Sequence, residues 1–448
     1  MLRAARIASG AILIAAVLAA PAMAQQASAD FVRVRGTKLL LGDRPYHFMG
    51  VNLWFAMNLG ADGAGGDRAR LVRELDRLQA LGVTNVRLMA ATEGPATEPS
   101  RVVPPAQPAP GRYDETVLRG LDFALAELRK RDMRAVLVLN NFFQWSGGMA
   151  QYVSWATGEP IPYPERNGKS WDDFQSYSAR FYATPSAQDI FERYVLAIVT
   201  RRNTVTGRAY HDDPTIMSWQ LSNEPRGFAF SEDYVRWVER AGAFLHAHAP
   251  RQLVSLGGEG KLDRGTPGTN TQFERVSRSK QLDYLTVHVW IENWGWYKPT
   301  QPDSTFDRAL GRTLSYVADH VAIARAVGKP VVFEEFGVSR DGGRFEPTAP
   351  VTLRDRWFTT VLEGLWYLAS ESQDSPVAGA NVWSWAGEAR PREAGGVWRA
   401  GDAFTGDPPH ERQGWYSVYD TDRSTLAIIA RYARLMDAIG APNAARQP

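Results

Sequence analysis

Strand-like and helix-like segments alternate along nearly the whole chain. Eight short, strongly apolar runs resemble strands, and each is followed by an amphipathic helix pattern or by a long loop. These runs are residues 47–54, 84–90, 134–140, 214–222, 251–258, 283–290, 330–337 and 378–387. Nearly continuous apolar runs are typical of parallel strands buried on both faces. Eight strand–helix units in this order predict an α/β fold, the closed (β/α)₈ TIM barrel.

The main competing fold is an open, doubly wound sheet. Such sheets often carry phosphate-binding loops, but the sequence has no G-x-G-x-x-G after a strand and no Walker A motif. No low-complexity linker divides the chain, so we predict a single domain over residues 25–448. A short hairpin within residues 31–48 is expected to plug the amino-terminal end of the barrel.

The first 24 residues have the pattern of a signal peptide. Arg3 and Arg6 precede a short apolar region, and small residues mark a cleavage site after Ala24. The apolar region is too short for a typical membrane span. We therefore expect a secreted or periplasmic protein with no membrane association after the signal is removed.

Charge and cysteine content exclude several functions. Without Arg3 and Arg6, the 51 basic residues become 49, equal to the 49 acidic residues. A chain without net charge is a poor candidate for binding nucleic acid, which favours basic surfaces. The chain has no cysteine, so it has no disulfide and no thiolate metal site. We expect a monomer stabilised by its core.

Glutamates end two of the predicted strands. The run "WQLSNEPR" brings Glu224 to a strand end, with Asn223 before it and Pro225 after it. The run "PVVFEEFG" ends in Glu334 and Glu335. Because side chains of a strand alternate between its faces, only one of Glu334 and Glu335 is expected to face the barrel centre. The carboxyl ends of barrel strands carry the chemistry of this fold.

Two carboxylates delivered by different strands are the machinery of glycoside hydrolysis. A separation of about 5–5.5 Å would make the enzyme a retaining one. This chemistry needs no cofactor, and a metal site has little support: His246 and His248 do not share a helix face, and no H-E-x-x-H motif occurs.

These motifs resemble those of a known family. "WQLSNEPR" and "FEEFG" are similar to the acid/base and nucleophile segments of glycoside hydrolase clan A. More narrowly, "LNNFFQWSGGMAQY" and "PPHERQGWYSVYDTD" resemble family 5 endo-β-1,4-mannanases. The resemblance extends over residues 31–436. It implies that Glu224 is the acid/base and Glu335 the nucleophile, so Glu334 is expected to face the helices. The ionised Glu335 is then expected to raise the pKa of Glu224.

The resemblance also implies roles for neighbouring residues. Arg87 would hydrogen-bond the nucleophile, and Asn223 would bind the sugar 2-hydroxyl. Arg226 would reach the leaving-group side of the cleft. Further substrate-binding candidates are His288, Trp290, Trp383, Trp54 and Trp145, with Trp383 as the platform under the cleaved sugar.

One position departs from the family pattern. Clan A enzymes have a tyrosine two residues after the histidine of strand six, where it bonds the nucleophile. This chain has Trp290 there, to which we assign no catalytic role, and Tyr297 is the candidate to replace the missing hydroxyl.

The resemblance implies a retaining endo-β-1,4-mannanase that acts on mannan, glucomannan or galactomannan. The tryptophan-rich stretches 141–148 and 290–297 offer flat surfaces along a cleft, which suits internal cleavage. Alternatives of the same fold are a cellulase and an exo-acting β-mannosidase. A non-catalytic glycan-binding barrel is the alternative from another class, although such a protein would normally have lost one of the two acids.

Overall fold

The computed structural model describes residues 30–262 and 271–440. The predicted signal peptide, residues 1–24, lies outside this part of the chain. In the described residues, no helix combines the length and apolarity that a membrane span requires.

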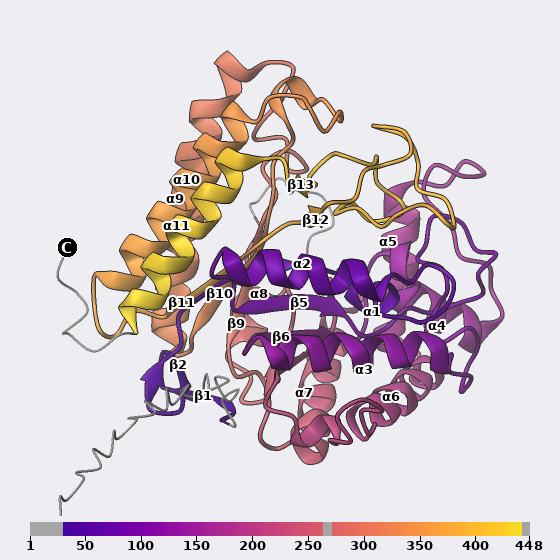
Figure 1. Ribbon diagram of the computed structural model, residues 1–448. Coiled ribbons are helices and arrows are strands. Elements are labelled where there is room, and N and C mark those ends of the chain that lie inside the picture. Colours follow the sequence, from indigo (N-terminus) through magenta and orange to yellow (C-terminus); the bar gives the residue numbers. More distant parts are fainter. Residues whose placement is uncertain (1–29, 263–270, 441–448) are drawn as a thin grey trace, which may run out of the picture.

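Eight parallel strands form one nearly closed barrel (Figure 1). They are β4 (Phe48–Asn52), β5 (Asn85–Met89), β6 (Arg134–Val138), β7 (Ile216–Gln220), β8 (Leu253–Ser255), β9 (Leu285–Val289), β10 (Val331–Phe336) and β11 (Val377–Val382). Their order in the sheet is β8-β7-β6-β5-β4-β11-β10-β9. Two backbone hydrogen bonds join β8 and β9, the strands at the two ends of this order. They run from Asp283 N to Val254 O (2.8 Å) and from His288 N to Glu259 O (3.0 Å). All eight predicted strands and the TIM barrel are thus confirmed.

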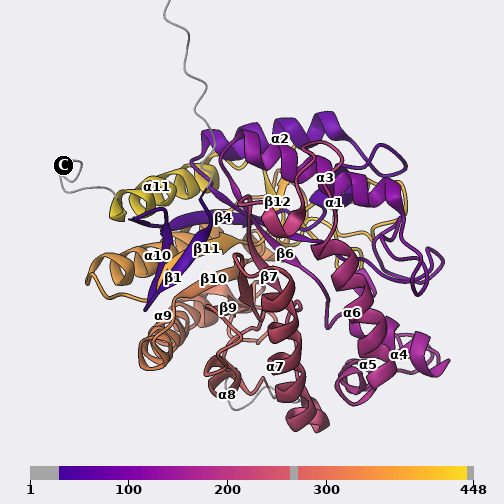
Figure 2. The ribbon, with the colours of Figure 1, turned by 90° about the horizontal axis from the view of Figure 1, so that it is seen from below.

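Helices surround the strands, as the amphipathic patterns predict (Figures 1 and 2). The helices that alternate with the strands are α2 (Arg68–Ala80), α3 (Glu115–Lys130), α6 (Pro185–Val199), α7 (Ser231–His248), α8 (Phe273–Ser277), α9 (Pro302–Val327), α10 (Thr352–Ser370) and α11 (Arg423–Ile439). Local signals set their ends. Asp114 caps α3 by accepting bonds from Thr116 N and Val117 N, and Gly328, with φ 78°, ends α9.

A small antiparallel sheet closes the amino-terminal end of the barrel (Figure 2). It consists of β1 (Val32–Arg35), β2 (Lys38–Leu41) and β3 (Arg44–Pro45). Val32 and Leu39 pack in one cluster with barrel residues such as Phe48, Met217 and Val332. The predicted hairpin therefore plugs the barrel, with a third short strand added.

Long connections extend the opposite end of the barrel. The segment between β6 and α6 carries α4 (Gly148–Thr157) and α5 (Trp171–Ala179). The segment between β11 and α11 carries β12 (Trp385–Gly387) and β13 (Val418–Tyr419). α1 (Ala56–Leu59) follows β4. The two long connections contribute residues to the rim of the site.

The proline-rich stretch 93–111 is ordered and braces this rim. Glu93 accepts hydrogen bonds from Gly148 N (2.9 Å) and from the Tyr152 hydroxyl (3.0 Å), so it ties the stretch to α4. Burial raises the pKa of Glu93 to about 7. The stretch supports the loops of the site without lining the cleft described below.

Candidate active site

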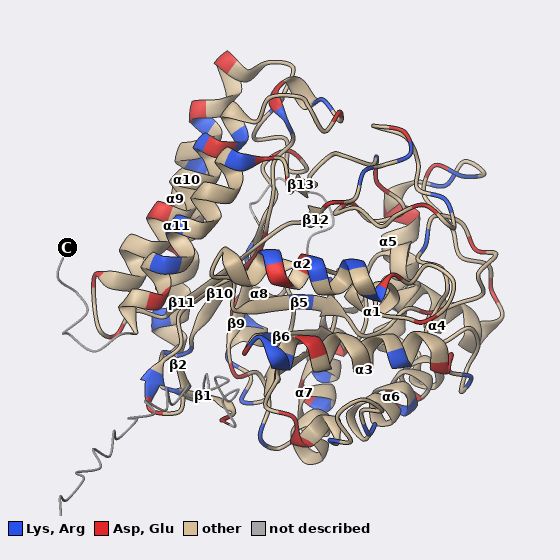
Figure 3. Ribbon diagram, in the orientation of Figure 1, with Lys and Arg blue, Asp and Glu red and all other residues tan. Residues whose placement is uncertain are grey.

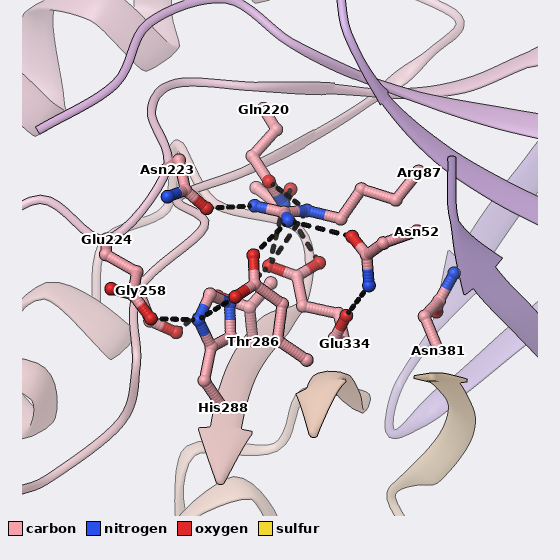
Figure 4. A network of polar contacts seen from close by, with 12 residues as sticks. Asn52, Arg87, Gln220, Asn223, Glu224, Gly258, Thr286, His288, Glu334 and Asn381 are labelled. Carbon is pink, nitrogen blue, oxygen red and sulfur yellow. Dashed lines mark hydrogen bonds and ion pairs between the residues drawn. The ribbon is translucent and has the colours of Figure 1, made fainter. Parts of the chain in front are cut away.

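A bulge in β10 brings two adjacent glutamates to the barrel centre. Phe333 pairs with Val287 and Glu335 with His288, so Glu334 is the extra residue. The Glu334 carboxylate accepts bonds of 2.9 Å from Gln220 Nε2 (Figure 4). The prediction that Glu334 faces the helices was therefore wrong, because strict alternation fails at a bulge.

Arg87, from β5, connects the groups at the barrel centre (Figure 4). Its guanidinium donates to a Glu335 oxygen and to Asn223 Oδ1 (2.8 Å). It also donates to Asn52 Oδ1 (3.0 Å) and Gln220 Oε1 (2.7 Å). The side chain is 3% exposed. Arg87 thus makes the contact with Glu335 that the resemblance implies, and it fixes Asn223 beside it.

Replacing Arg87 is expected to damage both stability and activity. Arg87→Met removes one of the two buried cations, Arg87 and His288, that contact Glu334 and Glu335, and breaking a buried ion pair costs about 3–5 kcal/mol. Arg87→Lys keeps the charge but loses the planar fork, so stability should fall less than in the Met variant. The measurements are chemical denaturation and kcat/KM calculated per folded enzyme molecule.

Arg201→Met removes another largely buried arginine, which pairs with Asp122, and this control should lower stability without changing kcat/KM. Equal loss of kcat/KM in both variants would contradict a role for Arg87 in the site.

Glu224 lies after β7 with a positive φ of 48°. Its Oε1 accepts hydrogen bonds from Trp290 Nε1 (3.0 Å) and lies 2.7 Å from His288 Nδ1. The same His288 nitrogen is 3.3 Å from Glu335 Oε2, and the other ring nitrogen is 3.4 Å from Glu334 Oε1. One oxygen of Glu224 and one of Glu335 lie within 4.8 Å of each other. His288 therefore sits between the two acids.

The two carboxyl groups differ in acidity. Burial raises the pKa of Glu335 to about 7, although the charges of His288 and Arg87 oppose this shift. Burial also disfavours the charged form of Glu224, but the hydrogen bond and charge of His288 bring the pKa of Glu224 below its usual value. The pKa of His288 rises to about 10, because its carboxylate neighbours outweigh its burial. The expected raised pKa of Glu224 was wrong for this site, since the sequence did not reveal the two donors on Oε1.

A cleft of about 510 Å³ opens above these groups. Its walls include Phe143, Trp145, Glu165, Trp171, Gln175, Asn223, Glu224, Arg226, Glu259, Trp290, Asn293, Trp294, Glu335, Trp383, Pro408, His410, Glu411, Arg412 and Trp415. Most predicted site residues therefore line one cleft. Arg87 and His288 lie directly beneath it and contact Glu224 or Glu335.

Two predicted residues lie elsewhere. The Trp54 indole donates to Gly406 O (2.7 Å), and its ring packs edge-on against Trp145 at 5.3 Å. Trp54 thus supports a cleft wall without being part of it. Tyr297 packs against Phe306 at 5.3 Å and is not one of the lining residues. It does not replace the missing tyrosine, and the Trp290 indole contacts Glu224 instead.

Sequence reasoning missed several residues of the walls, including Gln175 and Glu259, which are partners of the predicted Arg226. Arg226 forms a two-pronged ion pair with Glu259 (2.7 and 2.8 Å) and donates to Gln175 Oε1 (2.6 Å). Glu259 follows β8, so the rule that strand ends carry function could have found it. His410 and Glu411 lie within a quoted family stretch, whereas Glu165 has no local signal.

The acids and the histidine could hold a cation by distance alone. Within residues 30–262 and 271–440, Glu224, His288 and Glu335 are the one group whose donor atoms cluster closely enough. Each of the three side chains already has a protein partner, including the guanidinium of Arg87. Contacts between protein groups therefore account for the cluster.

Comparison with known proteins gives one consistent family. The model of "GH family 5 beta-mannosidase-like" proteins matches residues 29–440. A glycoside hydrolase family 5 mannosidase from Rhizomucor miehei is 36% identical over 93% of this chain and 99% of its own, with a TM-score of 0.85. A variant of that mannosidase has been solved in complex with mannosyl-fructose.

Two further proteins are more distant. The Arabidopsis thaliana mannan endo-1,4-beta-mannosidase 5 is 28% identical over 88% of this chain and 85% of its own. The Rhizomucor miehei endo-1,4-beta-mannanase shares the fold, with 20% identity over 91% of this chain and 99% of its own and a TM-score of 0.66. With the family model matching most of the chain, and with a barrel that brings two glutamates together, this protein belongs to glycoside hydrolase family 5.

Proposed function

We propose that this protein hydrolyses β-mannosidic bonds with retention of configuration, through two displacements. The observation that carries the proposal is the pair of oxygens, one from Glu224 and one from Glu335, within 4.8 Å of each other. Retaining enzymes hold their carboxyl groups about 5–5.5 Å apart, whereas inverting enzymes need about 6.5–9.5 Å to admit a water. The presence of both acids also disfavours a non-catalytic glycan-binding barrel.

In the first step, Glu335 attacks the anomeric carbon and the glycosidic bond breaks. Glu224 gives its proton to the departing oxygen. In the second step, Glu224 takes a proton from water as that water attacks the anomeric carbon, which releases Glu335. Asn223, held by Arg87, is placed to bind the 2-hydroxyl, a contact that strengthens in the transition state.

The acid pair must hold its proton on Glu224 when the reaction begins. Below about pH 7 the pair holds one proton, which the free site favours on Glu335. The reaction needs this proton on Glu224. His288 Nδ1 lies 2.7 Å from Oε1 of Glu224 and 3.3 Å from Oε2 of Glu335, so the proton should enter Glu224 at Oε2, the oxygen that His288 does not contact.

The proposed substrates are β-mannans and shorter β-mannosides, because the named relatives are mannosidases and mannanases. Two observations favour attack at a chain end. Identity is 36% to the Rhizomucor miehei mannosidase but 20% to the endo-mannanase of the same organism. In addition, Trp171 and His410, from the two long connections, touch at the cleft with ring centroids 6.1 Å apart. A contact between two walls of the cleft would limit how far a sugar chain can extend past it, which suits attack at a chain end.

Internal cleavage, the mode expected from the sequence, is the second candidate. The names of the curated plant relatives favour it, and the aromatic residues of the walls could stack against several sugars. A cellulase has no such support among these relatives.

Product analysis separates the two modes. With reduced mannohexaose, terminal attack should release mannose from the first minutes, together with products shortened by one sugar. Chromatography should also show slow action on high-molecular-weight mannan and little on cellulose. Early mannobiose and mannotriose with a rapid fall in polymer viscosity would establish internal cleavage. A preference for cellulose would overturn the substrate proposal and leave the mechanism standing.

We also propose that the enzyme works outside the cytoplasm, where polysaccharide is found. The signal-like pattern of residues 1–24 supports this proposal.

A further inference from the structure

Trp290 occupies a position that clan A enzymes give to tyrosine, and it contacts a different acid. It follows β9 directly, and its Nε1 donates to Oε1 of Glu224 at 3.0 Å. The ring is held on several sides. Trp383 packs edge-on against it with ring centroids 5.8 Å apart, and Tyr416 packs at a tilt with ring centroids 5.1 Å apart. A Cβ atom on Gly337 would approach Trp290 Cζ3 to 3.2 Å, so the absence of a side chain there makes room for the indole.

The two oxygens of Glu224 have different surroundings. Oε1 accepts from Trp290 and lies 2.7 Å from His288 Nδ1. Oε2 has no protein hydrogen-bond partner among the described residues, and Glu224 lines the cleft. An indole N–H can only donate. An oxygen that faces this donor must therefore remain an acceptor whether Glu224 is ionised or protonated.

We infer that Trp290 is a positioning residue that keeps Oε1 of Glu224 as an acceptor, so that Oε2 exchanges the proton with the substrate. The inference rests on the proposed double displacement. As the bond from the anomeric carbon to Glu335 forms, the glycosidic bond breaks and the Oε2 proton moves to the departing oxygen. In the second step the same oxygen takes the proton of the attacking water. A tyrosine hydroxyl could donate or accept and would not impose this choice.

The hydrogen bond from Trp290 Nε1 to Glu224 should also affect the pH dependence of the reaction. Several titratable groups surround Glu224. They are His288 from β9, Glu335 from β10, Arg87 from β5, Arg226 after β7, Glu259 after β8, and His410 and Glu411 from the connection before α11. These remain when the indole N–H is removed. Loss of a donor to the carboxylate destabilises its ionised form, so the pKa of Glu224 should rise.

The test compares Trp290→Phe with the wild type on two substrates. One is β-1,4-mannotriose, whose leaving group needs a proton, and the other is 2,4-dinitrophenyl β-mannoside, whose leaving group does not. We expect kcat/KM to fall roughly 10-fold or more on mannotriose but only about 2- to 3-fold on the aryl mannoside. The alkaline limb of the mannotriose profile should move up by about 0.5–1 pH unit.

Controls separate this role from packing. Tyr416→Phe disturbs a ring neighbour of Trp290 without removing a donor to Glu224, and its alkaline limb should stay in place. If Trp290→Phe fails to fold, site-specific replacement of Trp290 by benzothienylalanine keeps the shape and removes only the N–H. An equal loss on both substrates with an unmoved limb would overturn the inference. Absence of wild-type activity on mannotriose would instead overturn the proposed function.

Discussion

Glu335→Ala is expected to lose hydrolysis almost completely and to regain turnover when azide is added. Removing a covalent nucleophile lowers kcat by roughly 10⁴-fold or more. The shortened side chain leaves space for a small anion at the anomeric carbon, while Glu224 still protonates the departing oxygen. Azide should then form α-mannosyl azide from a β-mannoside, which chromatography and NMR can identify.

The neighbouring glutamate provides the matched control. Glu334 is equally buried and one residue away, but its carboxylate contacts Gln220, His288 and Arg87. Glu334→Ala should lower activity by disturbing these partners, and azide should not restore it. Rescue of Glu334→Ala and not of Glu335→Ala would show that the wrong neighbour had been assigned.

Glu224→Gln is expected to remove the alkaline limb of the pH profile. The active form of the acid pair carries one proton, and the pKa of Glu335, which burial raises to about 7, places the loss of that proton near pH 7. The wild-type rate should therefore fall as the pH rises through about 7. The variant has no acid to deprotonate, so its rate on 2,4-dinitrophenyl β-mannoside should stay level above pH 7.

In Glu224→Gln, the loss of rate should depend on the leaving group of the substrate. General acid catalysis contributes about 10²- to 10⁴-fold, so mannotriose hydrolysis should fall by that factor, with a much smaller effect on the aryl mannoside. Initial rates between pH 5 and 9 provide the measurement. An alkaline limb that survives in Glu224→Gln would show that another group is the acid.

The sequence predicted the barrel well because its strands leave a strong local signal. Nearly continuous apolar runs such as β6 and β10 alternate with amphipathic helices, and this pattern survives without knowledge of contacts. The ends of the strands then located Glu224 and Glu335. The hairpin that closes the amino-terminal end of the barrel was also predictable, since Val32 and Leu39 lie in two short apolar runs separated by a turn.

Features set by pairing or by distant contacts were not predictable in this way. The bulge that turns Glu334 inward depends on the register of β10 against β9. The contact of Trp290 with Glu224 joins residues that follow two different strands, and no local sequence pattern predicts it. The cleft walls after α4 and β12 have irregular backbone, whose position follows from packing and not from periodicity.

Trapping the glycosyl–enzyme intermediate tests the central claim most directly. With 2-deoxy-2-fluoro-β-mannosyl fluoride, the 2-fluorine slows both steps while fluoride leaves readily, so the covalent intermediate should accumulate. Intact mass spectrometry should show one fluoromannosyl group per enzyme, and fragmentation of the labelled peptide should place it on Glu335. A label on Glu334 or Glu224, or an active enzyme that remains unlabelled and releases the α-anomer of mannose first, would contradict the account.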